Sequence, residues 1–80
     1  MTVGWEEYDG KLTRSFELES FPAAVAFVAK VADIAEAQDH HPDIDIRWRT
    51  VRLAVNTHDK GGAITDKDHK LAEAVNALGT

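Results

Sequence analysis

The chain has 80 residues, of which 44% are hydrophobic and 29% are charged, and its formal net charge is −5. These values are typical of one small globular domain covering residues 1–80, a size at which oligomerisation often adds stability. An acidic chain without a basic cluster is a poor nucleic-acid binder, and the lack of cysteine excludes disulfides and thiolate metal sites. No apolar run approaches the ~20 residues that span a membrane and no signal peptide precedes the domain, so we expect a cytoplasmic protein.

Residues 3–18 predict a β-hairpin whose two-residue turn is Asp9-Gly10, because Asp-Gly tolerates the positive φ angles of a type I′ turn. After the turn, apolar and polar side chains alternate, which is the period of a strand with one buried face. The register set by this turn places Trp5 opposite Arg14. We therefore expect the Arg14 guanidinium to stack on the Trp5 ring.

A helix is expected from about Phe21 to Gln38, with Ser20 near its N-cap and a proline in its first turn. Its apolar residues follow helical spacing and form a stripe wide enough to cover a sheet and still face a partner chain. Pro42 disfavours helical backbone at the residue before it, so His40 and His41 fall at the helix C-terminus.

Glu36 lies four residues before His40, one helical turn back on the same face. A carboxylate in that place can accept a hydrogen bond from one ring nitrogen and orient the other for chemistry. We therefore expect Glu36 to be the orienting partner of His40.

Residues 43–57 predict a second hairpin, because apolar side chains recur at every second position of both halves. If Arg49-Thr50 is the turn, Trp48 faces Val51 and every apolar residue lies on one face of the hairpin. Trp48 is then more than ~15 Å from the histidines at ~3.3 Å per residue, so we expect it to belong to the core.

The same register brings the histidines together, because continued pairing places His41 opposite His58. A glycine-containing loop follows His58, and Thr65-x-x-Asp68 is the signature of a capping box that begins a last helix. His69, in the first turn of that helix, is expected to be an exposed surface residue. The predicted fold is α+β, with the order β-β-α-β-β-α and two helices on one face of a four-stranded antiparallel sheet of two hairpins.

Three histidines and Glu36 meeting at one end of a sheet allow three interpretations. Imidazoles that titrate near neutral pH are suited to general acid/base catalysis. A trio of histidines can instead bind zinc. Adjacent histidines can also be structural or solvated, with no function, and the residues alone leave these possibilities open.

The combined pattern resembles the signature of the pterin-4a-carbinolamine dehydratase family. That resemblance is carried by Glu36-x₃-His40-His41-Pro42-x₅-Trp48-x₉-His58-x₉-Asp68 and by flanking segments such as Gly4-Trp5-Glu6, and it covers essentially the whole chain. Family members commonly carry a further helix before the Gly-Trp segment, which we expect to be missing here. Asp68 belongs to the motif, and we expect it to cap the last helix.

The resemblance implies a hydro-lyase that dehydrates a 4a-hydroxytetrahydropterin to quinonoid dihydropterin and so recycles tetrahydrobiopterin for aromatic amino acid hydroxylases. It implies no metal and no cofactor, since the pterin is the substrate, and a homodimer or homotetramer. The alternative is a non-catalytic scaffold of the same fold, such as a transcriptional dimerisation cofactor or an assembly chaperone. The implied catalytic residues are His40, His41 and His58, and the implied substrate-binding residues are His40, His41, Pro42, Thr57, His58, Asp59 and Lys60.

Overall fold

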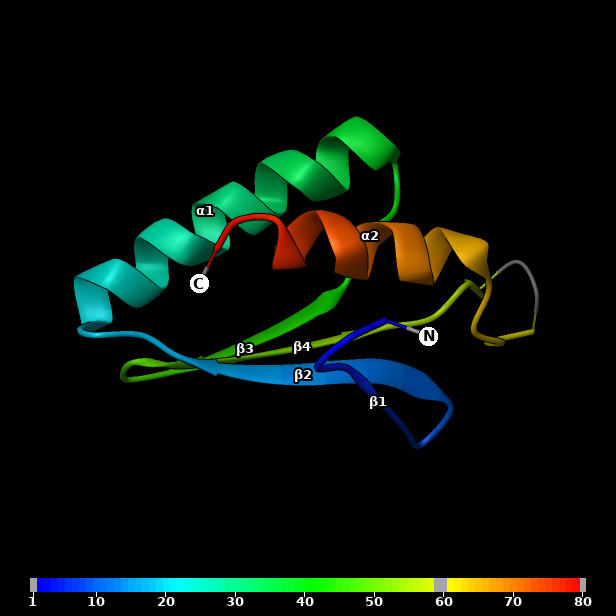
Figure 1. Ribbon diagram of the computed structural model, residues 1–80, viewed down its shortest axis with the longest axis horizontal. Helices are drawn as coiled ribbons and strands as arrows, with labels where there is room; N and C mark the ends of the chain where they lie inside the picture. The colour runs from blue at the N-terminus through cyan, green and yellow to red at the C-terminus, as the bar shows by residue number, and fades with distance from the viewer. Residues whose placement is uncertain (1, 59–60, 80) are drawn as a thin grey trace.

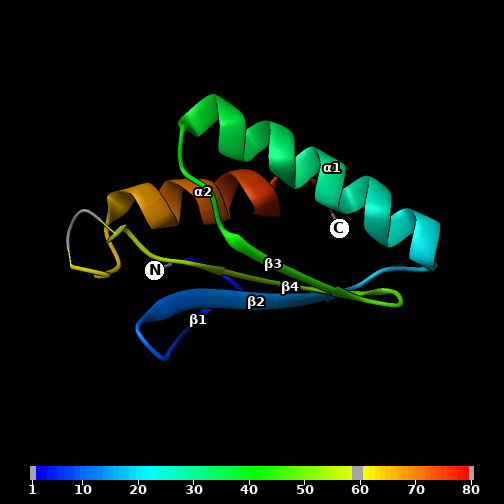
Figure 2. The same ribbon diagram turned by 180° about the vertical axis from the view of Figure 1, so that it is seen from behind.

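The computed structural model describes residues 2–58 and 61–79 and has the predicted element order. The elements are β1 (Glu6–Tyr8), β2 (Lys11–Glu17), α1 (Phe21–Gln38), β3 (Asp43–Arg47), β4 (Thr50–Val55) and α2 (Asp66–Asn76). The strands form one antiparallel sheet in the order β1-β2-β4-β3, and both helices lie on the same face of it (Figures 1 and 2). The predicted α+β fold is therefore confirmed. Neither described helix is long and apolar enough to cross a membrane.

The first hairpin has the predicted turn, but Arg14 lies elsewhere. Asp9 and Gly10 have φ angles of 53° and 76°, as a type I′ turn requires. The Arg14 guanidinium lies 4.5 Å from the centre of the Phe16 ring, so the expected stacking on Trp5 is wrong. The reason is that β1 begins only after Trp5, whose side chain is buried in the core.

Helix α1 begins and ends as the sequence predicts. The Ser20 side chain accepts a hydrogen bond from the Ala23 backbone N–H at 3.1 Å, which caps the first turn. At the other end Asp39 adopts a left-handed conformation with φ of 50°, and its N–H donates to carbonyls of the last turn. This reversal of the backbone decides which way His40 and His41 point.

The second hairpin is shifted by two residues from the predicted register. Arg47 pairs with Thr50, so the turn residues are Trp48 and Arg49. Because side chains alternate with a period of two, this shift leaves the same side chains on the same face. The prediction that Trp48 belongs to the core is wrong, because this turn residue is 85% exposed.

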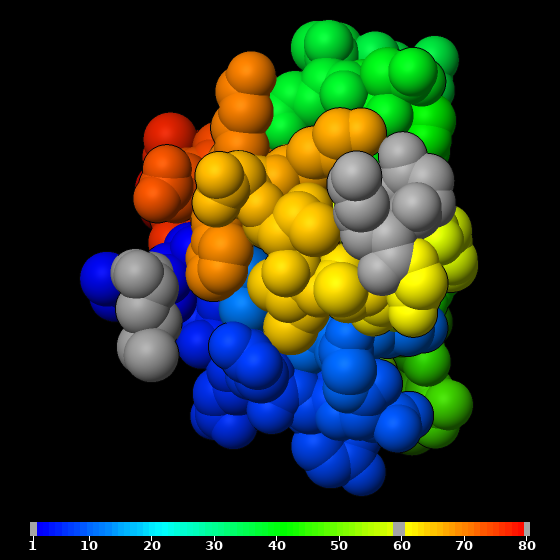
Figure 3. All heavy atoms as spheres, turned by 90° about the vertical axis from the view of Figure 1, so that its right-hand side faces the viewer, coloured from blue at the N-terminus to red at the C-terminus, as the bar shows by residue number. Residues whose placement is uncertain are grey.

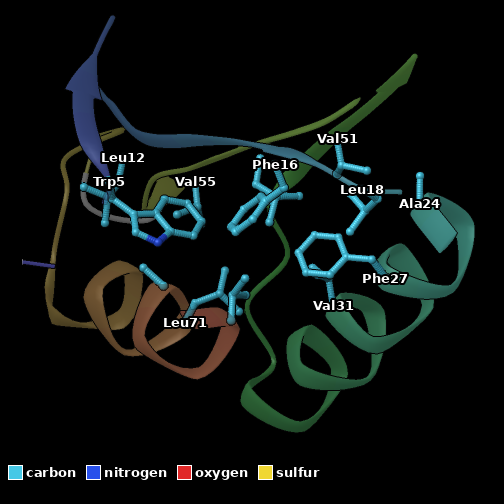
Figure 4. Packing of buried hydrophobic residues seen from close by; sticks show 13 residues of the cluster. Trp5, Leu12, Phe16, Leu18, Ala24, Phe27, Val31, Val51, Val55 and Leu71 are labelled. Carbon is cyan, nitrogen blue, oxygen red and sulfur yellow. The ribbon is translucent and has the colours of Figure 1, made fainter. Parts of the chain in front are cut away.

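The core lies between the sheet and the two helices (Figure 4). It consists of Trp5, Leu12, Phe16, Leu18, Ala24, Phe27, Val31, Val51, Leu53, Val55, Leu71, Ala72 and Val75. Ile44 and Ile46 also face the helix side but are 38% and 37% exposed, because β3 is the edge strand. The sheet therefore ends in an apolar, uncovered edge beside α1.

Helix α2 carries the predicted capping box, since the Thr65 N–H donates to the Asp68 carboxylate and the Thr65 side chain caps the first turn. His69 is only partly exposed, and its Nδ1 is hydrogen-bonded to the buried Thr2 hydroxyl at 2.7 Å. The prediction that His69 is an exposed surface residue is therefore wrong. At the other end, the Asn76 side chain accepts hydrogen bonds from Trp5 and Arg14, which ties the N-terminal segment to α2.

Candidate active site

Three histidines meet in a pocket at one end of the molecule. There the C-terminal end of α1, the end of β4 and the N-terminal end of α2 come together (Figure 3). The pocket has a volume of about 480 Å³ and is lined by Asp39, His40, His41, Asn56, Thr57, His58 and Lys67. The structure therefore brings the predicted trio together.

The detailed pairing behind that prediction is wrong. Because Asp43 pairs with Ala54, continuing the ladder places His40, and not His41, near the level of Thr57. The pocket forms nevertheless, because the chain enters β3 and leaves β4 at the same end of the sheet. The site therefore depends on topology more than on the exact register.

His40 is paired with Asp68 of α2. Its Nε2 lies 2.5 Å from the Asp68 Oδ1, and the two side chains are 12% and 0% exposed. The prediction that Glu36 would orient His40 is wrong. The sequence signal for the true partner was Asp68 itself, which belongs to the motif but was predicted only to cap a helix.

Glu36 is paired with His41 instead, with 2.5 Å between the Glu36 Oε2 and the His41 Nε2. The i to i+4 rule fails here because α1 ends before His40 and Asp39 turns the backbone into the left-handed region. These side chains are 77% and 59% exposed, so the pair lies at the solvent side of the pocket.

Both pairs lead to the same tautomer. An ionised carboxylate only accepts hydrogen bonds, so each histidine carries a proton on the Nε2 that faces its carboxylate. In His40 and His41 the remaining nitrogen is therefore Nδ1, which accepts a proton when the ring is neutral and donates one when it is charged. This assignment follows from the hydrogen-bond network.

The His58 ring differs from the other two, because it is exposed and has no hydrogen-bond partner among residues 2–58 and 61–79, whereas the His58 carbonyl accepts from the Gly61 N–H. Its two ring nitrogens are available to a ligand. Pro42 is half-buried and leads directly into β3. Asp59 and Lys60, which were predicted to bind substrate, lie outside the described residues.

A second hydrogen-bond network lies beneath His40. The other oxygen of Asp68, Oδ2, accepts from the Thr57 hydroxyl at 2.9 Å and from the Thr65 N–H at 2.8 Å. The hydroxyls of Thr57 and Thr65 are 2.6 Å apart. No buried side-chain polar atom of the described residues lacks a partner. The site therefore rests on a fully hydrogen-bonded support.

A metal interpretation has no ligand set in the described part of the chain. There, no three His, Asp or Glu side chains are grouped so that they could hold a metal ion. Two of the histidines use one ring nitrogen each for a carboxylate. Each of these two rings keeps its other nitrogen free, as histidines that bind a metal and histidines that transfer a proton both do.

Comparison with known proteins places the chain in a family. The sequence model described as pterin 4 alpha carbinolamine dehydratase matches residues 1–78. The chain belongs to the pterin 4 alpha carbinolamine dehydratase family. The predicted family resemblance is thereby confirmed.

Among relatives provisionally named pterin-4-alpha-carbinolamine dehydratase, one from Roseiflexus sp. strain RS-1 is 51% identical over 76 residues, or 95% of this chain and 81% of the relative. A second, from Chloroflexus aurantiacus, is 53% identical over 74 residues, or 92% of this chain and 78% of the relative.

Two solved structures share the fold. A transcriptional coactivator/pterin dehydratase from Brucella melitensis has a TM-score of 0.89 and 34% identity, with coverage of 99% of this chain and 85% of that chain. A pterin dehydratase-like RuBisCO assembly factor of the α-carboxysome has a TM-score of 0.75, with coverage of 98% of this chain and 89% of that chain. Its identity is 19%, so it supports the fold alone.

Proposed function

We propose that the protein is a 4a-hydroxytetrahydropterin dehydratase. The observation that carries this proposal is the meeting of His40, His41 and His58 in one pocket, with carboxylates on the first two. Family membership supplies the substrate class, because the family is described by its action on a pterin carbinolamine.

The reaction needs two proton movements, both of which histidines can perform. The C4a–O bond breaks as a proton reaches the leaving hydroxyl, and water departs. The neighbouring ring nitrogen loses its proton, and its electron pair forms the new C=N bond of quinonoid dihydropterin. We assign His40 as the donor of the proton to the leaving hydroxyl and His41 as the acceptor of the proton from the ring nitrogen. His58 assists from the remaining side of the pocket. No metal or cofactor takes part.

Glu36 is then an orienting residue for His41. The substrate contacts are His40, His41, Pro42, His58, Asp59 and Lys60, with Thr57 in the pocket wall. The physiological task would be tetrahydrobiopterin recycling beside an aromatic amino acid hydroxylase. The cytoplasmic location remains a prediction.

Turnover of a 4a-carbinolamine tests the proposal. The substrate can be generated in place by a hydroxylase, and its dehydration followed by absorbance against the uncatalysed rate. Replacing each histidine separately by alanine should lower kcat/KM by roughly 10²–10⁴-fold if that imidazole transfers a proton. His69→Ala is the matched control, because His69 is hydrogen-bonded to Thr2 and does not line the pocket. Unchanged rates in all three pocket variants would refute the proposal.

We further propose that two copies pair through the β3 edge. Strand β3 is exposed along its whole length, and Ile44 and Ile46 form an apolar strip there. If Ile46 of one copy faces Ile46 of the other in antiparallel pairing, Asp45 of each copy lies opposite Arg47 of the other. Such opposite-charge pairs favour this register.

The oligomeric state tests this pairing. In sedimentation experiments, Ile46→Lys should shift the protein toward monomer. Val3→Lys, at a side chain that is 82% exposed outside the strands, should leave the mass unchanged. A monomeric wild-type protein would refute the pairing. A scaffold function remains the alternative, favoured by this same apolar edge, and it would be supported by a dimer that shows no turnover.

A further inference from the structure

We infer that Asp68, held by the Thr57 hydroxyl and the Thr65 N–H, is a positioning unit for His40. The inference rests on the proposed function, because it assigns these residues to the ring that we propose as the acid. The resemblance implied substrate contact for Thr57, and the sequence predicted a capping role for Asp68 and Thr65. The structure gives all three a common task beneath the pocket.

Counting protons fixes the direction of the network. Thr57 has one hydroxyl proton, and its donation to Asp68 Oδ2 leaves Thr57 Oγ1 as an acceptor. Thr65 must therefore donate its own proton across the 2.6 Å contact to Thr57. The chain of donors thus runs from Thr65 to Thr57 to Asp68, and it ends on a carboxylate that also accepts from His40.

The two carboxylate oxygens have separate partners. Oδ2 accepts from Thr57 and from the Thr65 N–H, whereas Oδ1 accepts from His40. Because Asp68 is completely buried, its carboxylate has no water to replace a lost donor. The three donors therefore fix the carboxylate plane, and the plane fixes the His40 ring with Nε2 protonated.

The Thr57 hydroxyl is consequently unavailable to a substrate. Thr57 is 2% exposed, and its hydroxyl contacts only Asp68 and Thr65 within the described ranges. Its N–H donates to the Ala63 carbonyl, so the backbone donor is also in use. Thr57 shapes the pocket wall and acts on the reaction through Asp68 and His40.

The ¹⁵N chemical shifts of the His40 ring give a readout that does not require turnover. In its neutral form the His40 ring of the wild-type protein should show the Nε2–H tautomer. Asp68→Asn replaces an acceptor by a group that can donate, so it should change the tautomer and lower kcat by about 10- to 100-fold. The other titratable groups on this pocket are Asp39, His41, His58 and Lys67. The pH dependence of their chemical shifts must be measured in parallel.

Thr57→Val removes one donor with little change in shape. We expect a mixed His40 tautomer and a kcat about tenfold lower, with KM nearly unchanged, and Thr57→Ser should restore both. Thr13→Val is the matched control, because Thr13 is also a buried threonine but donates to the Glu6 carbonyl, away from the pocket. It should leave the His40 spectrum and kcat unchanged.

Three results would overturn the inference. The first is a wild-type His40 tautomer in both Thr57→Val and Asp68→Asn. The second is a failure of Thr57→Ser to restore the tautomer and the kcat that Thr57→Val loses. The third is a change of the His40 tautomer and kcat in Thr13→Val as large as that in Thr57→Val. If Thr57→Val does not fold, the wild-type protein provides the test. A buried Thr57 hydroxyl proton should exchange with water slowly enough to be seen by NMR. A rapidly exchanging hydroxyl proton would contradict the network. The tautomer result stands even if no pterin is turned over, so failure of this inference is distinct from failure of the proposed function.

Discussion

The three pocket histidines should differ sharply in what they contribute to stability, although we assign all three to one reaction. His40→Ala removes a donor from a carboxylate that is 0% exposed, whereas the His41–Glu36 pair is mostly solvated and the His58 ring has no hydrogen-bond partner in the described segments. A hydrogen bond to a buried charge contributes about 1.5–3 kcal/mol, and removing one partner of a buried pair costs about 3–5 kcal/mol. We therefore expect His40→Ala to lower the free energy of unfolding by about 2–4 kcal/mol.

The other two substitutions should have small effects. An exposed ion pair contributes about 0–1 kcal/mol, so His41→Ala should lie in that range. His58→Ala should lie within about 0.5 kcal/mol of the wild-type protein. For a domain of this size, about 1 kcal/mol moves the melting temperature by about 4–8 °C, so His40→Ala should melt on the order of 10–30 °C lower.

Urea denaturation followed by far-UV circular dichroism measures these differences. Protein concentration must be held constant, because association would add to apparent stability. His58→Ala is the internal control for loss of a pocket imidazole. An equal loss of stability in the His40 and His58 variants, or no loss in His40→Ala, would refute the assignment of Asp68 as the buried partner of His40.

Three further predictions concern the fold. Phe27→Ala, which empties a site packed 4.8 Å from the Phe16 ring, should cost about 3–5 kcal/mol and leave a marginal domain in urea titrations. Asn76→Ala should cost about 2–3 kcal/mol, because the N–H donors of Trp5 and Arg14 lose their common acceptor, and the Trp5 fluorescence should change. Trp48→Asn should raise the free energy of unfolding of the monomer by up to about 1 kcal/mol, because Trp48 has a φ of 53° that asparagine tolerates better. A large loss of stability in thermal melts would contradict this view of the turn.

The sequence alone determined the local structure, because local structure depends on neighbouring residues. The positive φ angles of Asp9-Gly10, the Ser20 cap and the Thr65 capping box are encoded within a few positions of one another. Alternation and helical spacing determined the strands and helices in the same way. The meeting of the histidines was also predictable, since a hairpin returns its two ends to one place.

Tertiary structure decided the register of the second hairpin and the exposure of its residues. A shift of two residues keeps every side chain on its face, so the apolar pattern cannot distinguish a turn at Trp48-Arg49 from one at Arg49-Thr50. Strand order made β3 an edge and left Ile44 partly exposed. Nothing in local alternation specifies which strand lies at an edge.

Tertiary structure also decided which carboxylate is hydrogen-bonded to each histidine. Glu36 lies one helical turn before His40 in sequence, but the left-handed Asp39 ends the helix and gives Glu36 to His41. Asp68 lies 28 residues from His40 and reaches it only because α2 packs against the end of α1. The sequence therefore determined which imidazoles share the pocket. Long-range packing decided which carboxylate holds each ring, because hydrogen-bond partners across two helices depend on the placement of both.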